Sequence, residues 1–570
     1  MLNLKIAKIF SEMAEYYVMK DDQFRPRAYE RAARLIESMK EDLEDIYKKG
    51  GVKALMKIEG IGKGMAEHIE EYIKTGKIKN FERLKKEAPI DLESFSSVEG
   101  VGPKMLLSLY KNLGVKNIRD LEKAARRKSI RTLPHFGEKT EKNILRSIEL
   151  SREHRGRFLF GYISPIVSKI ERDLASVPGV KKVLACGSYR RRKETVGDID
   201  ILAVTPDSRE IMDYFVSMPS VMKVIARGET KSMVRLDIGI DADLRVVSEK
   251  SFGAALQYFT GSKDHNVELR KIAIKKGWKL NEYGLYDKNN RKIAGQTEEE
   301  IYKKLGLDWM PPEMRENRGE IELALAHELP KIVEYGDVIS DLQMHTTYSD
   351  GAHTIEEMAH EAMRLGRKYI AITDHVGHLK IAGAMDVRTI EKQWREIEKV
   401  DRKMKGIKIL KGCEVDINSD GTVALEDKYL AKFDIVLGSI HSNFKMSKTE
   451  MTKRLVRAME NPYVDIISHP TGRIINRRAG YELDIDKIFR AAARFKTILE
   501  INAYPDRLDL NDINIRKAIE YGVKLSLGTD SHSKNQLHNL ELGIAQARRG
   551  WAKKEDIVNC LSWEDFLDIF

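Results

Sequence analysis

Two aspartates, Asp198 and Asp200, could together bind divalent metal ions. They lie in the segment GSYRRRKETVGDIDIL and alternate with Ile199, so they share one face of an expected strand. Two aligned carboxylates repel each other unless cations lie between them. A pair of Mg²⁺ or Mn²⁺ ions suits this arrangement, with one ion activating a hydroxyl group and the other holding the phosphates of a nucleotide. A solvated strand beside a basic helix is the alternative interpretation.

A third carboxylate is expected from a neighbouring strand within VRLDIGIDADLRVV. Asp237, Asp241 and Asp243 share the same parity there, so periodicity does not choose among them. Upstream, Gly187 and Ser188 begin a helix-like segment that continues into three consecutive arginines. Amides at the start of such a segment, together with guanidinium groups, suit a triphosphate.

Histidines and acids recur at the ends of apolar segments in the second half of the chain. These segments alternate with helical stretches, and repeated βα units favour a barrel, whose active site assembles at the C-terminal ends of its strands. Imidazoles mixed with carboxylates suit Zn²⁺, Mn²⁺ or Fe²⁺, and bridging acids allow more than one ion. A lone histidine would usually be structural, but five at strand ends favour a metal centre. The strand ends carry, in chain order, Gln343, His345, Asp350, Asp374, His375, Glu414, His441, His469, Asp530 and His532.

Paired glycines punctuate the first 150 residues. In KIEGIGKGMAEHI they are Gly60 and Gly62, and in SVEGVGPKMLLSL they are Gly100 and Gly102. Each pair follows one expected helix and opens another, which lets the backbone turn tightly and directs successive amides at a phosphate. A plain helical turn is the alternative for one copy. Two copies favour helix-hairpin-helix motifs that hold a nucleic-acid backbone without reading its sequence.

The composition restricts the class of protein. The chain has 570 residues, 42% hydrophobic and 33% charged, which is enough apolar material for several domain cores. Its three scattered cysteines argue against a disulfide framework or a thiolate zinc site, and no apolar run approaches the ~18 residues of a membrane-spanning helix. A net charge of +11 favours a polyanionic partner, although charge alone is weak evidence. The start of the chain has no signal-peptide pattern, so we expect a cytoplasmic protein with no membrane partner.

The first half of the chain resembles the beta-like family X DNA polymerases. The resemblance covers roughly residues 1–318 and rests on both glycine hairpins, GSYRRRKETVGDID, GETK, DLRVV, YFTGS and LNEYGL. It implies a two-metal polymerase site in which Asp243 also takes the proton of the primer 3′ hydroxyl. The implied metal ligands are Asp198, Asp200 and Asp243. The implied nucleotide contacts are Ser188, Arg191 and Gly197 to the triphosphate, Tyr258, Phe259, Gly261 and Asn266 to the sugar and base, and Arg270 to the template side of the minor groove.

Two positions depart from the pattern of this family. Lys263 stands where the animal enzyme has an acid, and we expect this cation to strengthen nucleotide binding before the template is contacted. His68 stands where the lyase members have a Schiff-base lysine, and because imidazole does not form that imine, the resemblance does not extend to abasic-sugar lyase activity. Arg25, Tyr29 and Lys63 match or lie near family positions that bind the 5′-phosphate of a gap.

The histidine-rich region resembles the polymerase and histidinol phosphatase (PHP) domain, a distorted barrel with a trinuclear metal site. Gln343 replaces the first ligand of the family's H-x-H pair, and because an amide oxygen is a weaker, neutral ligand, one metal position is expected to be looser or filled differently. Two or three ions of Zn²⁺, Mn²⁺ or Fe²⁺ are implied, and such sites activate water against phosphoesters. The ligand positions that match are His345, Asp350, His375, Glu414, His441, His469, Asp530 and His532.

The expected fold class is multidomain, with helical units, an α/β unit and a (β/α)7 barrel. We expect a helical DNA-binding domain at 1–85 and a fingers-like helical domain at 86–155, with one hairpin each. A nucleotidyltransferase palm is expected at 156–250, a thumb-like nucleotide-selection domain at 251–318, a linker at 319–336 and a PHP barrel at 337–570.

The expected function is gap-filling DNA polymerisation in repair, joined to metal-dependent hydrolysis at DNA 3′ ends. The barrel is expected to act as a 3′-to-5′ exonuclease, with abasic-site endonuclease or 3′-phosphatase activity possible in the same pocket. Two alternatives stay open: the barrel is a phosphatase for small phosphate esters, or the chain is a non-catalytic scaffold that binds DNA ends. The expected partners are gapped or primer-template DNA and deoxynucleoside triphosphates, and the chain is expected to be a monomer.

Overall fold

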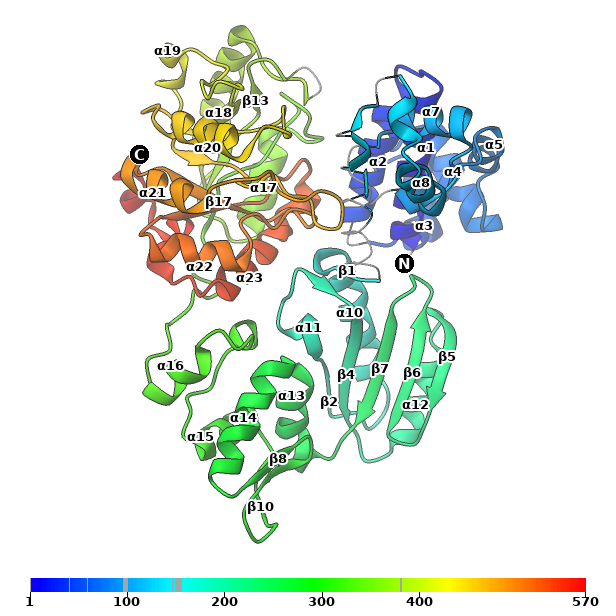
Figure 1. The fold of residues 1–570 in the computed structure, drawn as a ribbon, viewed down its shortest axis with the longest axis vertical. Helices are drawn as coiled ribbons and strands as arrows, with labels where there is room; N and C mark the ends of the chain where they lie inside the picture. Colours follow the sequence, from blue (N-terminus) through cyan, green and yellow to red (C-terminus); the bar gives the residue numbers. More distant parts are fainter. Residues whose placement is uncertain are drawn as a thin grey trace.

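The computed structural model divides into four successive units (Figure 1). A helical unit and a barrel lie at one end of the molecule, and a five-stranded sheet and a small helical unit lie at the other. The residues that the structure describes are 2–39, 41–58, 60–95, 101–134, 136–138, 140–142, 144–145, 148, 156–379 and 382–569.

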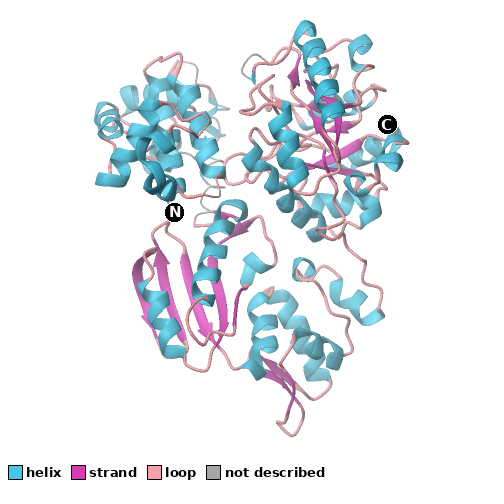
Figure 2. Cartoon of the chain, turned by 180° about the vertical axis from the view of Figure 1, so that it is seen from behind, coloured by secondary structure: helices cyan, strands magenta, loops and turns pink. Residues whose placement is uncertain are grey.

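The first unit is built only from helices in its described residues (Figure 2). Ile6, Phe10 and Met13 recur at helical spacing in α1 and are buried in its core. Gly62 and Gly102 N-cap α4 and α7, so the chain turns at each predicted hairpin directly before a helix. The helices are α1 (Leu2–Met19), α2 (Arg25–Ser38), α3 (Leu43–Leu55), α4 (Lys63–Thr75), α5 (Lys79–Glu87), α6 (Leu92–Phe95), α7 (Pro103–Leu113) and α8 (Ile118–Arg126), followed by the 3-10 turn η1 (Ile130–Thr132).

The second unit is a five-stranded sheet with the order β2-β4-β7-β6-β5. Strands β4 and β7 are parallel neighbours at its centre, and their apolar residues are buried against α10 and α12. The short strands β1 and β3 form a separate antiparallel pair. The elements are β1 (Phe158–Leu159), α10 (Phe160–Ala175), β2 (Lys182–Ala185), α11 (Gly187–Arg190), β3 (Thr195–Val196), β4 (Asp198–Val204), α12 (Ser208–Ser217), β5 (Val221–Arg227), β6 (Lys231–Leu236) and β7 (Asp241–Val246).

The third unit packs helices against a small antiparallel sheet of order β10-β9-β8. Residues 319–336, expected as a linker, begin with α16, whose Ile321 and Ala324 are buried in the core of this unit. The elements are η2 (Glu249–Ser251), α13 (Phe252–Thr260), α14 (Lys263–Lys275), β8 (Lys279–Asn281), β9 (Gly284–Tyr286), β10 (Lys292–Ala294), α15 (Glu298–Leu305), η3 (Pro312–Met314) and α16 (Glu320–Ala326).

The fourth unit is a barrel, as the βα repeats predict, and its distorted form with seven parallel strands is the one that the PHP resemblance implies. Its strands are short and buried on both faces, as expected for parallel strands covered by helices. Backbone hydrogen bonds close it, since the amide of His345 donates to Ser531 (2.8 Å) and that of Asp530 donates to Gln343 (3.0 Å). The strands are β11 (Ser340–Asp341), β12 (Tyr369–Ile372), β14 (Lys408–Asp416), β15 (Ile435–Ser439), β16 (Ile466–Ile467), β17 (Ile498–Asn502) and β18 (Leu525–Gly528), with β13 (His375–Val376) beside β14.

Helices connect these strands around the outside of the barrel. They are α17 (Ile355–Arg364), α18 (Val387–Lys403), α19 (Asp427–Leu430), α20 (Lys448–Met459), α21 (Ile485–Phe495), α22 (Asp512–Glu520), α23 (Leu540–Arg549) and α24 (Trp563–Leu567), with 3-10 turns η5 (Lys534–Asn539), η6 (Lys554–Asp556) and η7 (Val558–Cys560).

The barrel packs directly against the five-stranded unit. Ile475, Leu508 and Leu542 of the barrel belong to the same apolar cluster as α10. Arg473 of the barrel donates to Glu194 of the sheet unit (2.7 Å). The three cysteines are free and buried, in agreement with the absence of a disulfide framework. In the part of the chain that is described, every helix is too short or too polar to cross a membrane.

Candidate active sites

Three aspartates form a cluster on the two central strands of the five-stranded sheet. The register of β4 on β7 places Asp200 opposite Asp243 and Asp198 opposite Asp241. Asp241 is paired with Arg235, whose Nε lies 2.7 Å from its Oδ1, while Asp237 lies in the turn after β6. Asp198, Asp200 and Asp243 are therefore the set that faces a common space.

The electrostatics of Asp200 identify that space as a place for cations. Burial, and then the charges of Asp198 and Asp243, raise the pKa of Asp200 to about 6. Lys231 lies 3.2 Å from Asp243 and offsets only part of the repulsion. Carboxylate oxygens held close together at such a cost in energy fit Mg²⁺ or Mn²⁺.

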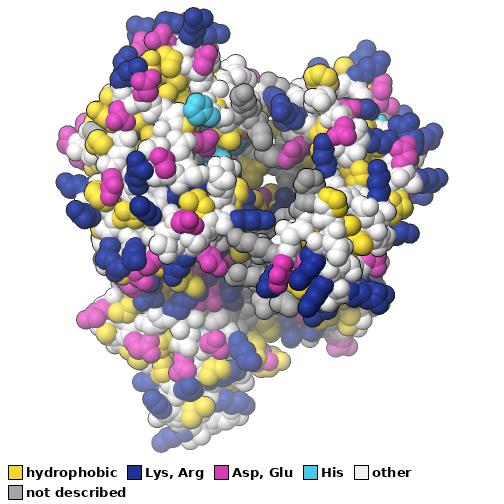
Figure 3. Space-filling model, turned by 45° about the horizontal axis from the view of Figure 1, so that its top comes forward, with side chains coloured by type: hydrophobic (Ala, Val, Ile, Leu, Met, Phe, Trp, Pro, Cys, Tyr) yellow, Lys and Arg dark blue, Asp and Glu magenta, His cyan; other side chains and the backbone are white. Residues whose placement is uncertain are grey.

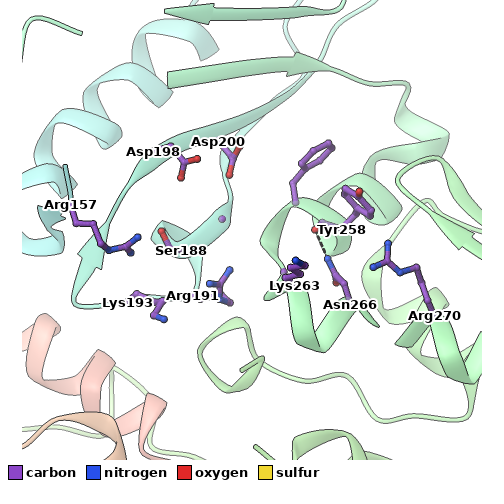
Figure 4. A pocket seen from close by; sticks show the side chains of 13 residues that line it. Arg157, Ser188, Arg191, Lys193, Asp198, Asp200, Tyr258, Lys263, Asn266 and Arg270 are labelled. Atoms are coloured by element: carbon purple, nitrogen blue, oxygen red, sulfur yellow. Dashed lines mark hydrogen bonds between the residues drawn. The ribbon is translucent and has the colours of Figure 1, made fainter. Parts of the chain in front are cut away.

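Asp198 and Asp200 open onto a cavity of about 430 Å³ between the second and third units (Figure 4), whereas Asp243, opposite Asp200 in the sheet, lies outside its lining. Asp198, Asp200 and Ser188 lie on one side of it, and Tyr258, Asn266 and Arg270 lie on the other. Of the predicted nucleotide contacts only Gly197 is outside the lining, although a Cβ there would lie 3.1 Å from Arg157. The lining residues are Arg157, Gly187, Ser188, Arg191, Lys193, Asp198, Asp200, Tyr258, Phe259, Gly261, Lys263, Asn266 and Arg270.

Two cations of this cavity were missed by the sequence reasoning. Arg157 precedes β1 and is held by Thr195, to which its Nε and Nη2 donate at 2.9 and 2.7 Å. Lys193 ends the basic run after α11, and burial lowers its pKa. Lys193 could have been found in the run RRRK, but the position of Arg157 depends on the pairing of β1 with β3, which the sequence does not specify.

Hydrogen bonds fix the side of the cavity on which the sugar and base contacts are predicted. The Nδ2 of Asn266 donates to the carbonyl of Tyr258 (2.7 Å), and its Oδ1 accepts from Gln257 (2.6 Å). The guanidinium of Arg245 lies 4.6 Å from the centre of the Phe259 ring. These contacts orient the aromatic pair before any ligand is present.

Position 187 must be a glycine because the Asp200 carboxylate lies directly against it. Its φ is +61°, and an added Cβ would lie 2.6 Å from the Asp200 Oδ2. We expect Gly187→Ala to strain the backbone by ~1–2 kcal/mol and also to displace the carboxylate, which lowers primer extension roughly 10- to 100-fold. Extension of a labelled primer and thermal unfolding measure the two effects.

Gly179→Ala is the matched control for this prediction. Gly179 has a similar φ of +77°, but an added Cβ would lie 3.9 Å from its nearest neighbours, so only the strain is shared. Equal loss of extension in both variants would mean that strain, and not displacement of Asp200, limits the reaction.

The predicted DNA contacts of the helical unit differ in how exposed they are. Gly60, with φ +88°, and Gly62 form the first hairpin, and open space lies beyond Gly62 and Gly102. Gly100 lies outside the described residues. Lys63 is exposed and extends from the start of α4. Figure 3 shows many Lys and Arg side chains on this unit, as expected for a surface that contacts phosphates.

Tyr29 does not face solvent, unlike a residue positioned for a phosphate. It is 6% exposed, and its hydroxyl lies 3.0 Å from the Nδ1 of His68. Burial lowers the pKa of His68, which favours the neutral imidazole. Arg25 is exposed, pairs with Asp22 (2.6 Å) and lies over the ring of Tyr17. Of these predicted 5′-phosphate contacts, Arg25 and Lys63 are therefore the accessible ones.

Glu414 is the centre of the histidine cluster in the barrel. It is 1% exposed and lies near the C-terminal end of β14, among four imidazoles. Its Oε2 lies 3.3 Å from the Nε2 of His345 and 3.4 Å from the Nδ1 of His375. Its Oε1 lies 3.1 Å from the Nε2 of His469 and 3.4 Å from that of His441. Each carboxylate oxygen thus faces a separate pair of histidines, which is the arrangement of a bridging ligand.

Two acids from other strands complete the cluster. Asp350 lies 3.3 Å from the Nε2 of His532 and 3.9 Å from that of His375. Asp530 lies 3.3 Å from the Nε2 of His345. The cluster includes three overlapping groups with spacings suited to metal ions: His345, Asp350, His375 and His532; His375, Glu414 and His441; and His345, Glu414 and Asp530.

The protonation pattern of the cluster fits metal ions. Both ring nitrogens of His345 are buried and form no hydrogen bond with the described residues. Burial alone would lower the pKa of His441, but hydrogen bonds to Asp416 and Glu414 outweigh it and raise that pKa to about 9. A metal ion would take the place of such a proton, and Asp416, 2.6 Å from the Nδ1 of His441, would hold the ring in its orientation.

Gln343 has neighbours that the sequence reasoning missed. It is fully buried beside Glu500 and Asn502 of β17, and its amide nitrogen donates to the Glu500 carboxyl in the orientation that satisfies both groups. Burial and the charges of Asp530 and Glu414 raise the pKa of Glu500 well above its usual range. The sequence offered one indication of Glu500, because it is the acidic residue within the expected strand TILEINAYP.

Arg507 and Asp374 show that a position at the end of a barrel strand does not by itself predict which side chains join the metal cluster. Arg507 follows β17 and its Nε lies 3.4 Å from the Oδ2 of Asp530, so it adds a buried cation to the cluster. Asp374 lies two residues after β12 but accepts hydrogen bonds from Thr346 and Gln393 instead of facing the histidines.

Family models match every unit of the chain. The matching descriptions are a helix-hairpin-helix domain at residues 1–78, a SAM-like helix-hairpin-helix tandem at 92–149, a DNA polymerase beta palm at 163–272, a DNA polymerase beta thumb at 255–316 and a PHP domain at 341–504. Fold and sites together define a beta-like polymerase joined to a PHP domain.

Full-length similarity extends this classification. The DNA polymerase/3′-5′ exonuclease PolX of Bacillus subtilis (strain 168) is 38% identical over 564 residues, which cover 98% of each chain. The chain therefore belongs to the PolX family of DNA polymerases with a C-terminal PHP domain. DNA polymerase lambda of Arabidopsis thaliana is 26% identical over 55% of this chain and 62% of its own length. A protein of Thermoanaerobacter sp. (strain X514) named "Probable phosphatase" is 30% identical over 39% of this chain and 90% of its own length.

Proposed function

We propose that this enzyme fills short gaps in DNA by template-directed nucleotide addition and shortens DNA 3′ ends in its barrel. The observation that carries the first activity is the carboxylate cluster at the edge of a cavity lined by Arg157, Arg191, Lys193 and Lys263. Its charge distribution suits a nucleoside triphosphate, with phosphates at the cations and metal ions at the carboxylates. The partners are gapped or primer-template DNA and deoxynucleoside triphosphates, bound by a monomer.

Each side of the polymerase cavity has its own part in the reaction. Asp198, Asp200 and Asp243 would hold Mg²⁺ or Mn²⁺, which when bound lowers the pKa of the attacking hydroxyl and neutralises phosphate charge. Asp243 accepts the proton of the primer 3′ hydroxyl. Ser188, Arg191 and Gly197 hold the triphosphate together with Arg157 and Lys193. Tyr258, Phe259, Gly261 and Asn266 contact the sugar and base, and Arg270 contacts the template side.

The barrel cluster supports hydrolysis of phosphoesters. Its four-histidine environment around Glu414 would hold two or three ions of Zn²⁺, Mn²⁺ or Fe²⁺, which when bound supply a hydroxide and stabilise the leaving oxygen. Asp416 orients His441, and Arg507 offers a cation for a phosphate oxygen. We infer that the substrate is a DNA 3′ end, because the helical unit and the polymerase cavity bind DNA in the same chain.

A labelled-primer experiment tests both activities. A primer with a 5′ label beside a short gap is incubated with Mn²⁺, with and without nucleotides. We expect lengthening with nucleotides and shortening without them. Absence of lengthening would contradict the polymerase proposal, and absence of shortening would contradict the exonuclease proposal.

The similarity of the barrel to a protein named a phosphatase supports a second candidate, hydrolysis of small phosphate esters. Competition separates the two. If the site acts on DNA, excess gapped DNA inhibits hydrolysis of a chromogenic phosphate ester, and undiminished hydrolysis would favour the small-ester phosphatase. A scaffold without catalysis would retain little metal after purification.

Lys263 is expected to strengthen nucleotide binding before DNA is present. It lines the cavity at the start of α14, opposite Arg191. Lys263→Asp reverses a charge beside the triphosphate and should weaken binding of a free nucleotide about tenfold or more. Equilibrium binding without DNA measures this. Lys271→Asp, on the same helix but outside the cavity lining, is the control, and an unchanged affinity in Lys263→Asp would refute the prediction.

A further inference from the structure

The geometry points to Arg549 of the barrel as a positioning residue for the polymerase cavity: it holds Arg191 through Glu316, so that the barrel sets the affinity for the incoming nucleotide. This inference rests on the proposed function, because it requires that Arg191 binds the triphosphate. It assigns the barrel a part in polymerisation that is separate from its own metal cluster.

Arg549 ends α23 and joins three structural units. Its side chain is 2% exposed. Its Nη1 donates to the carbonyl of Arg191 (2.7 Å) and to the Oε1 of Glu316 (3.1 Å), and its Nη2 donates to the Oδ2 of Asp512 in α22 (2.6 Å). Asp512 and α23 belong to the barrel, whereas Arg191 follows α11 in the sheet unit and Glu316 lies between η3 and α16 in the third unit. One buried guanidinium therefore connects all of them.

Glu316 passes this constraint to the guanidinium of Arg191. The same Oε1 that accepts from Arg549 accepts from the Nε of Arg191 (3.0 Å), and the Nη1 of Arg191 donates to the carbonyl of Thr260. Within the described residues these are its protein acceptors, so the remaining nitrogen, Nη2, is available to the cavity that Arg191 lines. Glu316 thus fixes the rotation of the group that would meet a phosphate.

The segment that carries Glu316 is held to the barrel at further points. Arg548 donates to Glu313 (2.8 Å), and Arg318 donates to Asp512 (3.1 Å). The same segment reaches the cavity a second time, because the amide of Ser262 at the start of α14 donates to the carbonyl of Arg315 (3.1 Å). The barrel therefore fixes both Arg191 of the sheet unit and the start of α14 in the third unit, which line the cavity, and Arg191 contacts Thr260 just before that helix.

Because the contacts of Glu316 are buried, they hold the side chains of Arg191 and Arg549 firmly in place. Glu316 is 10% exposed and lies among Arg191, Arg549 and Lys193. Removing Arg549 leaves Glu316 and Asp512 with one cation fewer in a medium where charges are poorly screened. Glu316 then reorganises around Arg191 and Lys193, and both are turned from the phosphate site.

The test is Arg549→Met in the full chain, with single-turnover extension on gapped DNA at varied nucleotide concentration. We expect the apparent Kd for the nucleotide to rise roughly tenfold, with a smaller change in the maximal rate and with unchanged shortening of 3′ ends. Arg549→Lys keeps the charge and one of the contacts, so it should recover part of the affinity. Adding Glu316→Gln to Arg549→Met should weaken binding little further, because both changes break the same connection.

Arg548→Met is the matched control, since Arg548 is a buried neighbour on α23 that pairs with Glu313 of the same segment but does not touch Arg191. An equal rise in Kd in Arg548→Met would mean that the variants loosen the interface in general and that Arg549 does not specifically position Arg191. An unchanged Kd in Arg549→Met would overturn the inference. If Arg549→Met does not fold, Glu316→Gln alone tests the same connection from its other end, with the same expected and contradicting results. Failure of the wild-type chain to extend the primer would instead reject the proposed function.

Discussion

Replacing Asp200 by asparagine is expected to abolish primer extension while making the metal-free protein more stable. The carboxylate is a proposed metal ligand, so we expect extension to fall at least ~10³-fold. The pKa of Asp200 is raised from 3.8 to about 6 in the folded chain, so the protonated form is favoured by folding, and stability is lost as the pH rises from about 4 through 6. At pH 7.5 asparagine avoids that penalty, which we put at ~1–3 kcal/mol.

Two measurements check this pair of opposite effects: single-turnover extension on gapped DNA, and thermal unfolding with a chelator present. Added Mg²⁺ should stabilise the wild type more than Asp200→Asn. Asp241→Asn is the control, because Asp241 lies on the neighbouring strand but is paired with Arg235. Extension that survives in Asp200→Asn, or that disappears equally in Asp241→Asn, would contradict the assignment of the carboxylate cluster.

The choice among Asp237, Asp241 and Asp243 shows where sequence reasoning stops in the polymerase half. Alternation along one strand predicts that Asp198 and Asp200 share a face, and it does so from local geometry alone. The partner strand cannot be aligned in that way, because register depends on contacts between distant segments. Only the pairing of Asp200 with Asp243, and the ion pair of Asp241 with Arg235, separate the three candidates.

The metal cluster of the barrel was easier to predict from the sequence, because the fold class determines where a site assembles. Strand ends at one rim bring His345, Glu414 and Asp530 together whatever the details of packing. The rule does not say which way a side chain turns at that rim. Glu500 lies within β17 and supports Gln343, and Asp374 follows the end of β12 yet binds Thr346.

No sequence pattern predicted the contacts between the structural units. Arg549 lies in a helix of ordinary amphipathic pattern, and neither its type nor its spacing relates it to Glu316, 233 positions earlier in the chain. Tyr29 likewise has a residue type that suits phosphate binding, but the packing of α1 and α2 buries it. Motifs therefore predict which residues can do chemistry, while tertiary packing decides which of them are free to do it.

Glu414→Gln is expected to abolish shortening of DNA 3′ ends and to lower the metal content of the purified protein, with primer extension retained. Each Glu414 oxygen faces its own pair of histidines, so the amide removes the charge that would join neighbouring ions and presents an N–H to imidazole nitrogens. We expect the rate of shortening to fall at least ~10³-fold. Elemental analysis and a labelled-primer assay without nucleotides measure the two effects.

His345→Ala should behave in the same way, because both nitrogens of His345 are buried in the cluster. His360→Ala is its control, since His360 lies on the exposed face of α17 beside Glu356 and should lose neither metal nor activity. Full metal content together with lost shortening in Glu414→Gln would make Glu414 an acid or base, not a ligand. Shortening that persists in both Glu414→Gln and His345→Ala would mean that hydrolysis occurs outside the barrel cluster.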